Sequence, residues 1–268
     1  MMMKVRLCMA VLLLVRVGSG ALRGETVAVV YPEGVVRGFL LLKSLDGAVV
    51  ANGDLTQVAR GDRVTSRLVF HFKDGSLQDE TCVFSQSGRF QLVSDHLVQR
   101  GPSFPDPMEI WVDVKGGQVK VRYSEDGKEK SLEEKMEMPS DLANGMVSTL
   151  LKNLAPGSDA PTVSMVVATP KPRLVKLVVT RVGDEPFAVA RRSYSATRFR
   201  VHVDIGGLAG VVAPLIGKQP KDTAVWIVGG DAPGFVQSEG PFFQGGPIWR
   251  MELAAPDYPR SEGRPAGR

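Results

Sequence analysis

Polar and apolar side chains alternate along most of this chain, and a period of two is the pattern of a β-strand with one buried face. In residues 119–123 (VKVRY) the apolar side chains fall on one face and the basic side chains on the other. Short glycine-containing turns separate such runs, at residues 45–48, 73–76, 115–118, 125–128 and 182–185. Turns of this kind accept the positive φ of tight hairpins, so the sequence predicts consecutive antiparallel strands.

One segment has a helical period instead. Its apolar residues recur every four positions, at Leu142, Met146, Leu150 and Leu154. Ser140 or Asp141 can cap the first turn, and Pro156-Gly157 ends the pattern. We therefore expect a helix over residues 141–155.

The predicted helix joins two strand-rich segments, residues 26–137 and 162–253, within a single domain over residues 24–255. Its apolar stripe needs a partner, and the sheet is available. The predicted fold is mainly β: a strongly curved antiparallel sheet, or partly open meander barrel, with the helix packed on its concave face. The Pro-, Gly- and charge-rich residues 256–268 are expected to form a disordered tail.

The amino terminus has the pattern of a secretory signal peptide. Lys4 and Arg6 precede the apolar run 7–15, and small residues follow at 18–21. A membrane-spanning helix needs about 20 apolar residues, and Arg16 interrupts this run first. We expect residues 1–20 to be cleaved and the mature chain, without a transmembrane span, to be periplasmic or secreted.

Cleavage would change the charge and cysteine content. The 268-residue chain has 33 basic and 29 acidic residues, a formal charge of +4, and residues 1–20 hold three of the basic residues and no acid. The mature chain would be nearly neutral, which argues against a nucleic-acid partner. It would retain Cys82 but not Cys8, so no intramolecular disulfide could form.

No catalytic or cofactor motif is complete. The run 210–220 (GVVAPLIGKQP) resembles a phosphate-binding loop, but its glycine spacing is wrong and Gln219 stands where the hydroxyl residue belongs. Ser94 and His96 share a strand face from which Asp95 points away, so they form no relay. The histidines lack metal-ligand spacing. We therefore expect no metal and no cofactor.

Basic residues concentrate between residues 171 and 200, a segment that contains eight lysines and arginines but only two acidic residues. Arg198, Arg200 and His202 share one strand face there, and such a row can hold phosphate or carboxylate. Acids on neighbouring strands would instead make it a solvated outer face. The candidate ligand-binding residues are Arg191, Arg192, Arg198, Arg200, His202, Trp226 and Trp249. A candidate apolar contact loop holds Val211, Val212, Leu215 and Ile216.

The order of elements resembles an uncharacterised family of exported bacterial β-proteins, filed as domains of unknown function. It is also similar in architecture to the half-barrels of periplasmic lipoprotein carriers. Residues 141–154 (DLANGMVSTLLKNL), 171–179 (KPRLVKLVV) and 247–253 (PIWRMEL) carry the resemblance. It extends over residues 25–255, implies an envelope location and a lipid-like ligand, and transfers no catalytic residue.

Three functions remain open. The first is a non-enzymatic envelope protein that binds a lipid, glycolipid or anionic amphipathic ligand. The second is a protein–protein interaction module that docks an envelope partner through a sheet edge or the loop 211–216. The third is a hydrolase of an envelope substrate with His71 or His202 as base. No sequence motif supports this third function.

Overall fold

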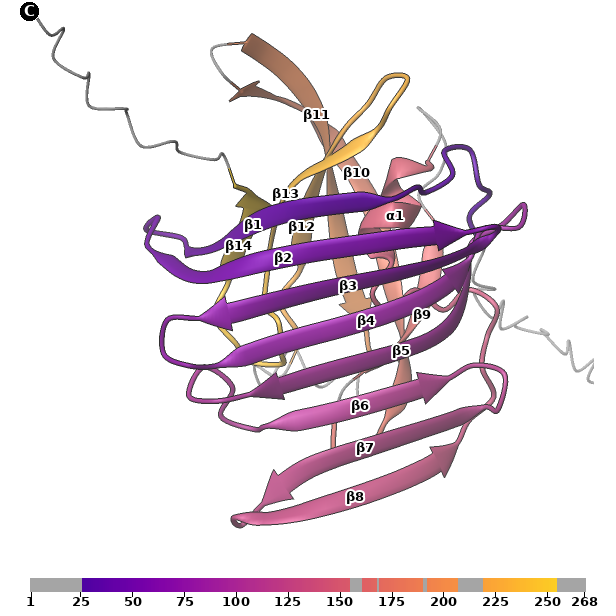
Figure 1. Ribbon diagram of the computed structural model, residues 1–268, viewed down its shortest axis with the longest axis vertical. Coiled ribbons are helices and arrows are strands. Elements are labelled where there is room, and N and C mark those ends of the chain that lie inside the picture. Colours follow the sequence, from indigo (N-terminus) through magenta and orange to yellow (C-terminus); the bar gives the residue numbers. More distant parts are fainter. Residues whose placement is uncertain (1–25, 155–160, 168, 190–191, 207–218, 255–268) are drawn as a thin grey trace, which may run out of the picture.

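A computed structural model describes residues 26–154, 161–167, 169–189, 192–206 and 219–254 (Figure 1). The strands are β1 (Val36–Ser44), β2 (Val49–Arg60), β3 (Arg63–Phe72), β4 (Leu77–Ser85), β5 (Gln91–Arg100), β6 (Met108–Asp113), β7 (Gln118–Glu125), β8 (Lys128–Lys135), β9 (Thr162–Val167), β10 (Arg173–Val189), β11 (Arg192–Asp204), β12 (Thr223–Val228), β13 (Gly234–Gly240) and β14 (Trp249–Leu253). The helix α1 spans Val147–Lys152. The predicted signal peptide 1–20 and the tail 256–268 lie outside the described residues.

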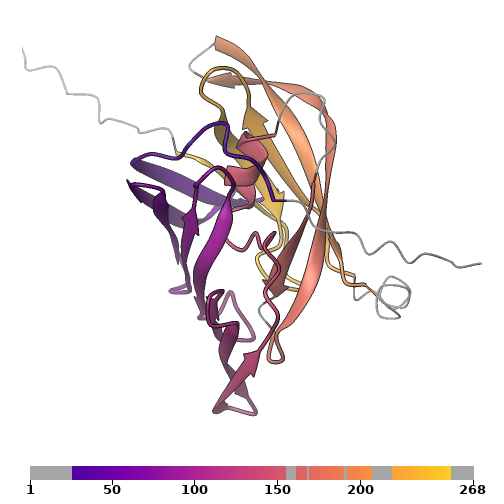
Figure 2. The ribbon, with the colours of Figure 1, turned by 90° about the vertical axis from the view of Figure 1, so that its right-hand side faces the viewer.

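The described strands form one 14-stranded antiparallel sheet in the order β8-β7-β6-β5-β4-β3-β2-β1-β14-β13-β12-β11-β10-β9. The first strand pairs with the last, Leu42 opposite Met251, so the two ends of the strand sequence meet in the middle of the sheet. The sheet edges are β8 and β9, which do not pair with each other. The sheet therefore curves into two facing walls without closing (Figure 2), and the predicted open meander barrel is confirmed.

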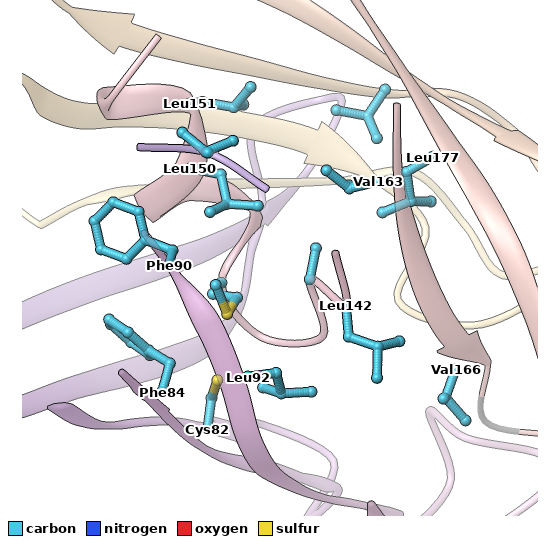
Figure 3. Packing of buried hydrophobic residues seen from close by; sticks show 14 of the residues in the cluster. Cys82, Phe84, Phe90, Leu92, Leu142, Leu150, Leu151, Val163, Val166 and Leu177 are labelled. Carbon is cyan, nitrogen blue, oxygen red and sulfur yellow. The ribbon is translucent and has the colours of Figure 1, made fainter. Parts of the chain in front are cut away.

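Apolar side chains from both walls fill the concave side. Phe84 and Val121 come from one wall and Leu177 and Phe199 from the other, and all are buried in one cluster. Figure 3 shows Phe84, Leu92, Val163 and Leu177 pointing into this shared space, with the chain that carries Leu142 between them. A second cluster around Phe70, Phe104 and Trp249 lies on β1–β3 and β14 and the adjoining loops.

The helix is shorter than predicted: it covers six residues, not 141–155. Gly145 has a φ of +63°, which interrupts a right-handed helix. Asp141 and Asn144 use their side chains to hydrogen-bond β9 instead of capping a helical turn. Leu150 and Leu151 are nevertheless buried between the walls, so the predicted position on the concave face is confirmed. The helix is also far too short to cross a bilayer.

Residues 141–146, hereafter the brace, cover the open edge of β9. The Val166 N–H donates to Asn144 Oδ1 at 2.9 Å, and Asn144 Nδ2 donates to the Val166 carbonyl at 2.8 Å. The Ala143 N–H donates to the Ser164 carbonyl at 2.8 Å. A single amide side chain thus replaces a peptide unit of a neighbouring strand.

The other edge, β8, carries a charged sequence, KEKSLEEK. Charged side chains on an edge strand disfavour pairing with another chain. Covering one edge and charging the other keeps the sheet open without leaving an exposed apolar edge.

We expect Asn144→Ala to lower the free energy of unfolding by about 2–4 kcal/mol, because two buried backbone groups of Val166 lose their partners. Chemical denaturation measures this. Asn52→Ala is the matched control, since Asn52 is exposed on β2 and should change stability little. Equal effects of the two substitutions would contradict the structural role of Asn144.

Candidate functional site

A hollow of about 410 Å³ lies where β9, β10 and the end of β11 meet residues 137–139. Its lining residues are Glu137, Pro139, Ser164, Leu174, Val175, Lys176, Asp204, Ile205 and Gly206. Leu174 and Lys176 point to the face opposite the buried Leu177, so the hollow opens on the outer side of the sheet. Its volume is typical of small-molecule sites, which span about 300–1,000 Å³.

The floor of the hollow is a hydrogen-bonded group of three side chains. Lys176 Nζ lies 2.8 Å from Ser164 Oγ and 3.1 Å from Asp141 Oδ2. The Ser164 hydroxyl in turn donates to Asp141 at 2.9 Å. Lys176 is ion-paired with Asp141, and Ser164 is 1% exposed. Since a serine nucleophile needs access to substrate, this group is a structural one.

The predicted basic row lies on the outer face of β11 and leads to the hollow. Phe199 and Val201 are buried in the core, so Arg198, Arg200 and His202 point outward. Asp204, which lines the hollow, continues the same face. The row and the hollow form one continuous outer surface on β10 and β11.

Acids on neighbouring strands partly neutralise the row. Glu185 accepts hydrogen bonds from Trp226 Nε1 at 2.8 Å and from Arg198 Nη1 at 3.2 Å. These contacts lower the pKa of Glu185. The hydrogen bond from Trp226 is the larger cause, and Arg198 adds to it. Asp222 lies 2.7 Å from His202 Nδ1 but 3.8 Å from Arg200 Nε. Arg200, with its side chain 55% exposed, is the cation of the row most available to a ligand.

The other predicted site residues are divided. Trp226 joins the row, since it lies opposite Arg198 in the sheet with the guanidinium 5.1 Å from its ring centroid. Arg192 is exposed at the far end of β11. Trp249 is 6% exposed in the second core cluster, on the opposite face of the sheet from Trp226. Its indole packs against Phe72 and Phe242, so the structure does not bring it to the row.

Arg191 and the apolar contact loop with Val211, Val212, Leu215 and Ile216 lie outside the described residues. In the sequence, Val211 follows Gly206, a lining residue of the hollow, by five positions.

The histidines do not assemble a catalytic site in the described part of the chain. His71 lies in a polar hollow on the outer face of β2–β5, beside a bidentate Arg67–Asp79 pair. His96 stacks on Trp111 and contacts Glu109 at 2.9 Å. His202 is paired with Asp222. No group of three or more metal-ligating side chains occurs among the described residues.

Sequence reasoning missed a pair of carboxyl groups on the concave side. The register sets Asp95 opposite Cys82 and Glu80 opposite Leu97, so Glu80, Cys82 and Asp95 share the inner face of β4 and β5. Burial raises the pKa of Glu80 to about 7. Burial, and then the Glu80 charge, raise the pKa of Asp95 well above its usual value. The alternation of side chains along β4 does place Glu80 on the same face as Cys82. Alternation does not, however, give the register with β5 that brings Asp95 beside them.

Comparisons with known proteins give a weak structural likeness. No family model matches the chain, and no curated protein matches it by sequence. The hypothetical lipoprotein YmcC from Escherichia coli aligns over 83% of this chain and 85% of its own, with 9% identity and a TM-score of 0.35. A β-barrel-like protein of the domain of unknown function DUF1849 from Brucella abortus aligns over 82% and 96%, with 9% identity and a TM-score of 0.43. The expected likeness to uncharacterised β-proteins is thus found, and it carries no argument about function.

We expect the double variant Glu185→Gln, Asp222→Asn to bind an immobilised polyanion such as heparin more tightly, on the order of tenfold at low salt, because the row loses its neutralising acids. Salt-gradient elution measures this. Asp62→Asn, Asp231→Asn gives the same change in net charge at two exposed positions away from the row. If both double variants elute at the same salt concentration, net charge alone explains the binding.

Proposed function

We propose that this chain is an exported, non-enzymatic protein of the cell envelope that binds an amphipathic ligand with an anionic group on the outer face of β10 and β11. The observation that supports this proposal is that the partly apolar hollow is continuous with the basic row. The apolar part of the ligand would occupy the hollow against Leu174 and Ile205. Its anionic group would contact Arg200.

Charge and spacing define the orientation of such a ligand. Glu137 and Asp204 line the hollow and would repel an anion there. Arg200 lies four residues from Asp204 along β11, about 13 Å at roughly 3.3 Å per residue. A ligand whose anionic group is about that far from its apolar end meets both requirements.

The outer face is a better candidate for this role than the concave side. Side chains of both walls pack together on the concave side, where Phe84, Val121 and Leu177 are all buried. A ligand there would have to displace core side chains, whereas the hollow is already open.

We expect native mass spectrometry of the mature protein, purified from the envelope fraction, to detect an adduct of lipid mass. Leu174→Asp should reduce its occupancy at least tenfold, because a charge would replace an apolar wall. Arg200→Glu should reduce it for anionic ligands.

The matched controls are Leu45→Asp and Arg63→Glu, exposed positions in other hairpins that should leave the adduct unchanged. A clean protein mass for the unaltered chain, or an adduct insensitive to Leu174→Asp, would overturn the proposal.

A second candidate function is docking of an envelope protein by the β10–β11 ribbon. β9 pairs with β10 only up to Val178, and β12 pairs with β11 only from Ala196, so the described ribbon continues as two strands paired with each other. Figure 1 shows it extending past the rest of the sheet. Tyr194 is 42% exposed and stacks on Phe187 at 5.4 Å. Exposed aromatic side chains on an extended arm suit protein recognition.

For this candidate we expect a photocrosslinker at position 194 to give one discrete product in intact cells, and Phe187→Asp to abolish it by removing the stacked ring. The same crosslinker at Leu45 serves as the control position. Products of equal yield from both positions, or none from either, would reject the docking role.

A further inference from the structure

The concave side contains ionisable groups that the proposed ligand site does not use. Asp95 is 3% exposed, and its Oδ1 atom has no hydrogen-bond partner. Glu80 is half-buried on the neighbouring strand, at a diagonal position on the same face. Diagonal neighbours across two strands are within reach of long side chains. Neither carboxyl forms an ion pair with a cation of the described residues.

The brace packs directly on these groups. Cys82 Sγ donates to the Asn144 carbonyl at 3.2 Å. A Cβ added to Gly145 would lie 2.7 Å from Cys82 Cβ and 3.3 Å from Asp95 Oδ1, so only glycine fits. Figure 3 shows Cys82 on the same side as Phe84 and Leu92, facing the chain that carries Leu142.

The same brace holds the opposite wall. Asn144 pairs with Val166 of β9, and Asp141 binds Ser164 of β9 and Lys176 of β10. Residues 141–146 therefore connect β4 and β5 with β9 and β10 across the concave side.

The charged groups around the two carboxyls are few. On β3, Leu68 lies opposite Glu80 and Ser66 lies opposite Cys82. Ile110 and Val112 occupy the same face of β6, and all four residues are uncharged. The brace contributes Gly145 and Asn144, and the hydrogen bond from Asn144 lowers the pKa of Asp95 without offsetting the larger effect of burial. The one charged residue of the brace, Asp141, pairs with Lys176 on the other wall. The site thus comprises Glu80, Asp95 and the Cys82 thiol.

We propose that Glu80 and Asp95 form a proton-sensitive latch: the pair fixes the brace against β4 and β5 while it carries a proton, and releases it when both carboxyls are ionised. Two adjacent carboxylates without a counter-ion repel each other, whereas a shared proton supplies one donor and removes one charge. Release would free Cys82 and loosen the link between the walls.

The direction of the pH dependence follows from linkage. The pKa of Glu80 rises on folding to about 7, and that of Asp95 rises as well, so the folded state binds these protons more tightly than the unfolded state. The stabilisation is therefore complete at acidic pH and is lost as the pH rises through about 7.

Cys82 supplies the measurement. In the full chain with Cys8→Ser, Cys82 is the sole thiol. We expect iodoacetamide to alkylate it at the same rate in this protein and in its Glu80→Gln variant at pH 5.5. At pH 8.5, alkylation should be at least tenfold slower in the variant, because the latch stays closed without the second charge.

Simple electrostatics predicts the opposite sign, which makes the test decisive. The Glu80 charge raises the pKa of the Cys82 thiol, after burial and Asp95, so removing it alone would speed alkylation. A Glu80→Gln rate at pH 8.5 equal to or above that of the parent overturns the latch. Asp79→Asn, the same class of change on the outer face of β4, is the control and should follow the parent protein.

Hydrogen exchange separates local release from general unfolding. Between pH 5.5 and 8.5, after correction for intrinsic rates, we expect protection to fall at least tenfold in residues 141–150 and to stay constant in β1 and β2. A parallel loss in all strands would overturn the latch, as would unchanged protection of residues 141–150. Because Glu80 is half-buried, Glu80→Gln is expected to fold even if Asp95→Asn does not.

Discussion

The open sheet depends on the side chain of Asn144, which takes the place of a neighbouring strand at the edge of β9. Its amide both donates to and accepts from Val166, so one side chain satisfies two buried backbone groups. Closing the barrel through β9 would require β8 to occupy this position, and β8 is charged along its length. The two edges therefore stay apart for two reasons. The backbone groups of Val166 on β9 are already hydrogen-bonded to Asn144, and the charged side chains of β8 are unsuited to burial.

Because the concave side of the open sheet is filled, the proposed ligand site lies on the outer face. The walls bury their apolar side chains against each other, as in the two layers of a sandwich. The hollow beside Leu174 and the row ending at Arg198 lie on the opposite face, where strand alternation places polar and charged side chains. The basic row could be predicted because its members are two residues apart on one strand. Its neutralising acids could not, because Asp222 precedes the next strand and Glu185 reaches the row across the hairpin.

Local patterns predicted the strands better than the element between them. The glycine turns give hairpins at four of the five predicted places, as at Gly75 and Gly127, both with positive φ. The prediction of a turn at residues 182–185 is wrong, because these residues lie inside β10, where the pairing with β11 only shifts register between Arg181 and Gly183. The four-residue period from Leu142 to Leu154 predicted too long a helix, because these residues are spaced for burial between two walls and not for a continuous helical stripe. Asp95 shows the same limit: its own strand places it away from Ser94 and His96, but only the register with β4 brings it beside Cys82 and Glu80.

The brace connects the buried carboxyl pair with the hollow on the outer face. Asp141 belongs to the brace and also holds Lys176 and Ser164, which line the hollow on the outer face. A change in the brace would therefore reach the proposed ligand site through a chain of direct contacts. Linkage makes such coupling reciprocal. A ligand that binds more tightly to the braced form would raise the proton affinity of Glu80 and Asp95, and protonation of that pair would strengthen ligand binding by the same factor. Neutral pH, near the pKa of Glu80, is where this exchange between proton and ligand would be most sensitive.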